Sequence, residues 1–146
     1  MSEHLIKQTM ADNIVIDTNC LVMMVSARNK YHAIWQSFLD GEFNMCVSNE
    51  ILEEYAEVLA RNINIDVARF VVFTIMERKN VKLIVPYYKW QLITADPDDN
   101  KFVDCAISAN ARFLVTEDKH FQVLHQVQFP VVDVIGIDDY LQIISS

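Results

Sequence analysis

Four acidic residues from separate parts of the chain have the type and position expected of divalent metal ligands. Asp17 and Asp118 each follow a short apolar run, and Glu54 and Asp104 lie in segments with helical periodicity. Carboxylates gathered without partners repel one another and lose solvation. Hard Mg²⁺ or Mn²⁺ ions relieve that cost, because they prefer oxygen ligands. If the chain folds so that these acids converge, they form a metal site.

Each of these acids also has a structural explanation. Asp17 is in position to cap the helix that follows it. Asp104 shares a polar strip with Lys101 and Ser108 on an otherwise apolar helix, and such a strip is typical of a solvated face. The catalytic interpretation therefore depends on all the acids occurring together.

A run of glutamates follows Ser48, a natural helix N-cap. At 100° per residue, Glu53 and Glu57 fall opposite the apolar stripe centred on Tyr55, so we expect them to be solvated. Glu54 lies at the edge of that stripe, where a side chain can reach inward. Glu54 is therefore the candidate ligand from this helix.

The elements that must position these acids alternate between β-rich and helical patterns. Predicted strands are Asn13–Asp17, Asn44–Val47, Val81–Val85, Phe113–Thr116 and Val131–Val134. Predicted helices are Cys20–Ala27, Tyr31–Leu39, Asn49–Asn62, Asp66–Asn80 and Asp98–Asn110, with a short last helix after Asp138.

This alternation predicts an α/β fold with a central, mainly parallel sheet of four to five strands flanked by helices. In such sheets the ligand site lies beyond the carboxyl ends of the strands, where Asp17 and Asp118 fall. The chain has only two glycines, which excludes a phosphate-binding Walker loop and a GxGxxG dinucleotide turn.

Composition favours one domain spanning residues 1–146, with residues 1–12 as a flexible N-terminal segment. The hydrophobic fraction of 52% suffices for a sizeable core, and no apolar run is long enough to cross a bilayer or act as a signal peptide. Three widely spaced cysteines favour small buried side chains in a reducing compartment. We therefore expect a cytoplasmic protein without a membrane segment.

The formal net charge of −8 is unfavourable for binding a polyanion unless bound cations supply positive charge. A local basic excess lies between Arg61 and Lys89, where a solvated helix face is the simpler interpretation. The scattered histidines His32, His120 and His125 lack zinc-site spacing and are interpreted as surface or packing residues.

The sequence resembles the PIN-domain family, and within it the VapC-like ribonucleases that are toxin components of bacterial toxin–antitoxin systems. The similarity extends over Asn13 to Tyr140, and its strength lies in the order and spacing of short motifs. These motifs are Ile16–Asn19, Ser48–Leu59, Asp96–Asn100, Asp104–Ala109 and Val115–Phe121.

The resemblance implies a three-layer PIN-like fold and a metal-dependent endoribonuclease that leaves 5′-phosphate and 3′-hydroxyl ends. The implied catalytic acids and Mg²⁺ or Mn²⁺ ligands are Asp17, Glu54, Asp104 and Asp118. Supporting positions implied by the resemblance are Thr18, Asn19, Asp99, Asn100 and Thr116. Glu117 departs from the family pattern and adds negative charge beside the site. Implied partners are an RNA substrate, an antitoxin protein and further copies of the chain.

Two other interpretations remain open at this stage. A catalytically inactive PIN-fold module that binds proteins would retain the acids only as caps and surface charge. A haloacid dehalogenase-type phosphatase also carries an aspartate after its first strand, but it requires a second acid where this chain has Asn19.

Overall fold

Five short parallel strands form the central sheet of the computed structural model, which describes residues 11–146. Central strand β1 is fully buried over Ile14, Val15 and Ile16, as expected for a parallel strand covered on both faces. This sheet confirms the predicted α/β fold. In sheet order the strands are β3 (Val81–Leu83), β2 (Asn44–Val47), β1 (Asn13–Ile16), β4 (Phe113–Val115) and β5 (Val134–Ile135).

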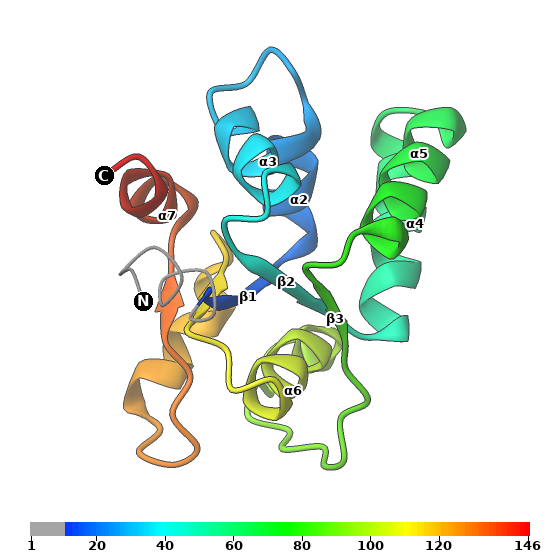
Figure 1. Ribbon diagram of the computed structural model, residues 1–146. Helices are drawn as coiled ribbons and strands as arrows, with labels where there is room; N and C mark the ends of the chain where they lie inside the picture. Colours follow the sequence, from blue (N-terminus) through cyan, green and yellow to red (C-terminus); the bar gives the residue numbers. More distant parts are fainter. Residues whose placement is uncertain (1–10) are drawn as a thin grey trace.

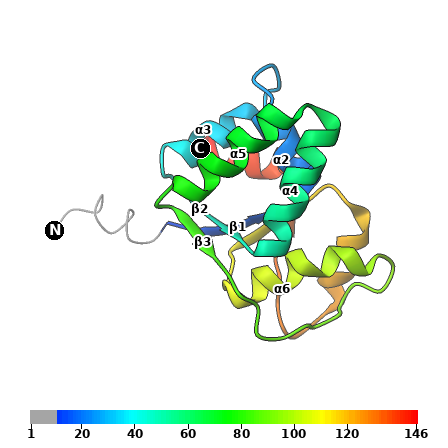
Figure 2. The same ribbon diagram turned by 90° about the vertical axis from the view of Figure 1, so that its right-hand side faces the viewer.

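Helices cover both faces of the sheet and give the molecule three layers (Figures 1 and 2). One face carries α2 (Thr18–Val25), α3 (His32–Leu39), α4 (Asn49–Asn62), α5 (Ile65–Glu77) and α7 (Ile137–Ile144). The other face carries α6 (Asn100–Ser108), with 3₁₀ turns at η1 (Pro97–Asp99) and η2 (Lys119–Gln126).

The chain changes direction across the sheet at β1. From β1 it proceeds to β2 and β3 on one side, and it then returns through α6 to β4 and β5 on the other side. The N–H of Asp17 donates to the carbonyl of Val115 at 2.9 Å, so the ends of β1 and β4 lie side by side. Such a switch point in strand order is where open α/β sheets bind ligands.

Several boundaries differ from the sequence prediction at the sheet edges. Strand β3 ends at Leu83 rather than Val85, and β5 is Val134–Ile135 rather than Val131–Val134. Edge strand β5 can pair only with the three residues of β4, so Val131 remains exposed despite its apolar type. The predicted last helix is present and begins at Ile137.

Residues 1–10 of the predicted flexible segment lie outside the described residues. Asp12, at the end of that segment, is fixed against the sheet. Its carboxylate forms a 2.6 Å ion pair with Arg112, and its carbonyl accepts a hydrogen bond from the N–H of Asn44. These two contacts therefore fasten Asp12 to the sheet just before β1.

The core contains the apolar side chains of α3, including Ile34, Trp35 and Phe38. Cys20, Cys46 and Cys105 are buried free thiols, as expected. Within residues 11–146, none of the helices combines the length and apolar composition needed to cross a bilayer.

Candidate active site

Asp17 lies at the carboxyl end of β1 and is only 6% exposed. Its Oδ1 accepts from the backbone N–H of Thr18 at 2.8 Å, and its Oδ2 accepts from the hydroxyl of Thr116 at 2.7 Å. Burial raises the pKa of Asp17, and the charges of Glu54 and Asp118 raise it further, while the two hydrogen bonds lower it. Asp17 is thus both the expected helix cap and a buried acid facing other acids.

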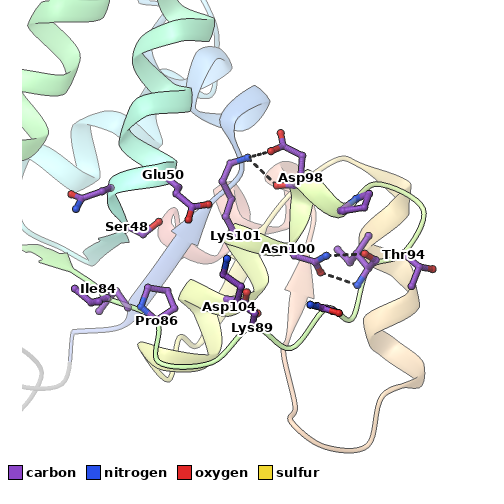
Figure 3. A pocket seen from close by; sticks show the side chains of 15 residues that line it. Ser48, Glu50, Ile84, Pro86, Lys89, Thr94, Asp98, Asn100, Lys101 and Asp104 are labelled. Carbon is purple, nitrogen blue, oxygen red and sulfur yellow. Dashed lines mark hydrogen bonds and ion pairs between the residues drawn. The ribbon is translucent and has the colours of Figure 1, made fainter.

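Glu54 reaches inward from α4 and is held by two partners. The hydroxyl of Thr18 donates to one carboxylate oxygen, and Nζ of Lys101 lies 2.8 Å from the other. Lys101 also contacts Asp98 at 2.9 Å, and its side chain is only 8% exposed (Figure 3). Burial favours the neutral amine, but the bonds to Glu54 and Asp98 dominate and raise the pKa of Lys101. The buried ammonium group of Lys101 therefore lies next to the acids.

Asp99 and His120 carry buried polar atoms without hydrogen-bond partners. Asp99 Oδ2 and His120 Nδ1 are 3.7 Å apart and neither is hydrogen bonded within the described chain. His120 Nδ1 also lies 3.3 Å from Oδ1 of Asp118, which is fixed by the backbone N–H of His120. One ligand atom each from Asp96, Asp99 and His120 falls within 4.8 Å of the others. Buried atoms that lack hydrogen-bond partners and converge in this way are suited to bind a metal ion as ligands.

The charges that act on Asp99 connect the group of Asp96, Asp99 and His120 to Asp17. Burial raises the pKa of Asp99 to about 7, and the charges of Asp118, Asp96 and Asp17 add to that effect, while His120 opposes it. Thr116 hydrogen bonds to both Asp17 and the backbone N–H of Asp118, and His120 lies against both Asp118 and Asp99. Asp17, Asp99 and Asp118 therefore share one cluster at the carboxyl ends of β1 and β4. Hereafter the acid cluster means Asp17, Glu54, Asp99 and Asp118.

Asp104, an expected ligand, is not brought into the acid cluster. It is buried on α6, and its Oδ1 accepts from the backbone N–H of Trp90 at 3.1 Å. Burial raises the pKa of Asp104, and the charged groups that influence it are Glu50 and Lys89 rather than the cluster acids. Figure 3 shows its side chain beside Lys89 in a separate cavity. Three of the four predicted acids converge, and Asp99 occupies the fourth place.

The predicted supporting residues differ in what they do. Thr18 and Thr116 hold Asp17 and Glu54, as described above. Asn100 is not in contact with the acids. Its side chain exchanges two hydrogen bonds with the backbone of Ile93, which fastens the segment before η1 to α6. Asn19 is exposed on the first turn of α2.

His120 and Asp96 were not identified as site residues from the sequence. Asp96 accepts from the N–H of Asp98 and caps the turn that presents Asp99. His120 follows Asp118 by two residues, and that short spacing is the signal in the sequence that could have identified it. His32 matches its predicted packing role, because its ring contacts the carbonyl of Met24.

Charged residues outside the cluster have mainly structural roles. Glu117 points away from the cluster, and its carboxylate accepts from the N–H of Ile137 at the start of α7. Two residues of the basic stretch have partners within the protein: Arg61 pairs with Glu57, and Arg78 donates to the carbonyl of Leu39. The hydrogen bond from Ile137 therefore fixes the carboxylate of Glu117 at the start of α7.

The acid cluster has the composition of a site for a hard divalent cation. Its carboxylate oxygens, together with the imidazole nitrogen of the neighbouring His120, make a set of ligand atoms that suits Mg²⁺ or Mn²⁺. Asp17 and Asp118 are oriented by hydrogen bonds from Thr116, Thr18 and His120, so the oxygens are positioned in advance. Such a cation would offset the repulsion that raises the pKa of Asp99.

Solved structures with a similar fold include VapBC structures and a PIN domain endonuclease. The structure of VapBC2 from Rickettsia felis bound to a promoter DNA fragment has a TM-score of 0.57 and 16% identity, covering 85% of this chain and 98% of that one. VapBC-1 from nontypeable Haemophilus influenzae has a TM-score of 0.58 and 19% identity, with 86% and 98% covered. The PIN domain endonuclease Utp24 has a TM-score of 0.52 and 17% identity, with 85% and 84% covered.

At these identities the likeness of structure shows the fold. No curated protein sequence matches the chain. The PIN domain model matches residues 13–120, which include β1 to β4 and every member of the acid cluster. The chain therefore belongs to the PIN domain family.

Proposed function

We propose that the protein is a metal-dependent endoribonuclease that hydrolyses RNA phosphodiester bonds. The observation that carries this proposal is a pair of buried atoms, Asp99 Oδ2 and His120 Nδ1, that lie 3.7 Å apart and have no hydrogen-bond partners. They lie beside Asp17 and Asp118. Leaving such atoms without partners is costly unless a ligand completes them. A cation is the ligand that satisfies both the orphaned atoms and the excess negative charge.

The residues that would hold Mg²⁺ or Mn²⁺ are Asp17, Asp99 and Asp118, with Glu54 and His120 completing the set directly or through water. Bound there, the ion would supply positive charge for the scissile phosphate and lower the pKa of a water molecule. Asp104, which was expected among the ligands, has no part in this proposal because it faces another cavity.

The chain itself prepares the site by fixing its acids. Thr116 and the N–H of Thr18 hold both oxygens of Asp17, so this carboxylate cannot rotate away. Lys101 holds Glu54 and places one ammonium group at the border of the cluster. Among the described residues, Lys101 is the one buried basic side chain beside the cluster. A phosphodiester that enters the site would therefore meet its ammonium group on the Glu54 side. Its charge opposes the repulsion between RNA and a protein of net charge −8.

We further propose that the protein is a toxin component that binds an antitoxin and forms homo-oligomers in the cytoplasm. Helix α5 supports a protein partner, because Phe70, Phe73 and Met76 are each about two-thirds exposed on one of its faces. Apolar side chains gathered at helical spacing on a surface favour contact with another chain. The buried free thiols support a reducing compartment.

The test is a cleavage assay on defined single-stranded RNAs with Mn²⁺, Mg²⁺ or a chelator. We expect cleavage only with metal, and at least a 100-fold loss for Asp17→Asn and Asp99→Asn. Both replacements are nearly isosteric, so their thermal unfolding in chelator should remain cooperative. Glu53→Gln, on the solvated face of the same helix as Glu54, is the matched control and should cleave like the wild type.

Failure of the wild type to bind Mn²⁺ at millimolar concentrations in calorimetry would contradict the metal site and favour a non-enzymatic binding module. Retained activity in Asp17→Asn would contradict the assignment of that residue.

A further inference from the structure

A cavity of about 620 Å³ adjoins the acid cluster and has no role in the chemistry proposed above. It lies between the first turn of α4, the segment after β3 and the start of α6 (Figure 3). Its volume falls in the range of sites for small organic groups. Its lining includes Ser48, Glu50, Ile84, Lys89, Lys101 and Asp104.

The cavity and the acid cluster share a wall. Lys101 lines the cavity, while its Nζ contacts Glu54 of the cluster at 2.8 Å. Ser48 follows β2 directly, and β2 pairs with β1, whose end carries Asp17. The cavity is therefore one strand away from the cluster along the same edge of the sheet. A nucleotide whose phosphate lies at the cluster can extend its base into this space.

The cavity has several polar groups, and among them are a buried carboxylate, that of Asp104, and the ammonium group of the exposed Lys89. Asp104 is 6% exposed, and within residues 11–146 its one protein donor is the N–H of Trp90, which binds Oδ1. Asp104 and Lys89 both line the cavity, and their side chains lie near each other in Figure 3. The carboxylate thus retains free acceptor capacity on the cavity side, with a donor beside it.

Apolar side chains line part of the cavity and suit the face of an aromatic ring. Ile84, Val85 and Pro86 form one side, and Ile93 and Pro97 contribute from the segment that leads to α6. Bases that are unstacked in single-stranded RNA bind in this way, with their faces on apolar side chains and their edges on polar groups. A phosphate is disfavoured inside the cavity because three acidic residues of its lining, Glu50, Asp98 and Asp104, outnumber the two lysines, Lys89 and Lys101.

We propose that this cavity binds a guanine base of the RNA next to the scissile phosphate, with Asp104 and Lys89 reading its edge. This inference rests on the nuclease activity proposed above. Guanine presents two adjacent donors, N1–H and N2–H₂, which a carboxylate can accept together, and an O6 acceptor beside them for an ammonium group. Adenine lacks the N1–H donor and the O6 acceptor. Uracil offers one ring N–H.

Cleavage preference is the first test. RNA oligonucleotides with one guanine in an otherwise uridine sequence are compared with the same sequence carrying adenine or uridine at that place. We expect kcat/KM to favour the guanine oligonucleotide at least 10-fold, with scission at a fixed distance from the guanine. Asp104→Asn and Lys89→Met should lower kcat/KM for the guanine oligonucleotide at least 10-fold more than for the others. Glu53→Gln is the matched control.

Binding of guanosine without phosphate tests the cavity independently of cleavage. Guanosine should shift the backbone amide resonance of Trp90, which is hydrogen bonded to Asp104, more strongly than adenosine does. The shift should persist in Asp17→Asn and disappear in Asp104→Asn.

The outcomes separate the two proposals. If the wild type cleaves no RNA and guanosine still shifts Trp90, the nuclease proposal fails and the base site stands. Cleavage without a guanine preference, or equal effects of guanosine and adenosine on Trp90, overturns the base site.

Discussion

The hydroxyl of Thr116 donates a hydrogen bond to Oδ2 of Asp17 at 2.7 Å and accepts one from the N–H of Asp118 at 3.0 Å. One side chain at the end of β4 therefore orients an acid at the end of β1 and the turn that carries a second acid. Neighbouring parallel strands bring these groups together, although almost a hundred residues separate them in the sequence.

Thr116→Val is expected to weaken Mn²⁺ binding about 10- to 100-fold, a loss typical when a residue that orients a metal ligand is removed. Valine keeps the shape of threonine but removes the donor, so burial acts on the Asp17 carboxyl without that opposing bond and raises its pKa further. Calorimetry at two pH values measures this, because the deficit should shrink at higher pH. Thr116→Ser restores the hydroxyl and should bind nearly as the wild type does. An equal loss in both variants would contradict the hydrogen-bonding role.

His120→Asn is expected to reduce the preference for Mn²⁺ over Mg²⁺. An imidazole nitrogen suits Mn²⁺ better than Mg²⁺, whereas carboxylates and water suit both ions. The ratio of the two dissociation constants from calorimetry should therefore approach that of an all-oxygen site, falling about 3- to 10-fold. Variant His125→Asn, an exposed histidine in η2, is the matched control and should leave the ratio unaltered. An unchanged ratio in His120→Asn would remove this residue from the ligand set.

Lys101→Met is expected to destabilise the protein by roughly 1–3 kcal/mol in the absence of metal, because it leaves Glu54 beside other acids without its cation. Added Mn²⁺ should recover part of that loss, since the ion replaces the missing positive charge. Thermal unfolding with and without Mn²⁺ measures both effects. Lys101→Arg keeps the charge and serves as the control, although its planar group fits the two acceptors differently. A loss that Mn²⁺ leaves unchanged would show that Lys101 acts through packing alone.

The fold was predictable because its signals are local. Continuous apolar runs marked the strands, and Ser48 with the stripe centred on Tyr55 marked α4 with the bounds that the structure has. Asp17 and Asp118 were predictable for the same reason, because each lies just after an apolar run that marks a strand. The edge strands were less predictable, because the length of β5 is set by its partner β4 rather than by its own residues.

The choice between Asp99 and Asp104 was not available from the sequence. Both lie near the start of α6, and helical spacing alone favoured Asp104 because it interrupts an apolar surface. The structure shows that the turn at Pro97, capped by Asp96, directs Asp99 to the cluster, and that a chain segment without regular structure presents Trp90 to Asp104. Tertiary placement of irregular segments decides such cases.

The pH dependence of stability provides a test of Asp99 that does not require activity. Its carboxyl titrates near 3.8 when unfolded and at about 7 when folded. Between these values the folded protein binds more protons than the unfolded chain, so the free energy of unfolding falls as pH rises. In chelator, the titration of Asp99 should lower the free energy of unfolding by on the order of 2 kcal/mol between pH 4.5 and pH 8.

Asp99→Asn removes this titration, so in chelator the variant should gain stability relative to the wild type as pH rises through that range. With Mn²⁺ the order should reverse above pH 7, because the wild type binds the ion through the deprotonated carboxylate and the variant does not. Urea unfolding at several pH values, with chelator or Mn²⁺, measures the difference. Asp139→Asn, an exposed acid in α7, is the control and should follow the wild type. Parallel curves for Asp99→Asn and the wild type would place Asp99 outside the repelling cluster and remove it as a metal ligand.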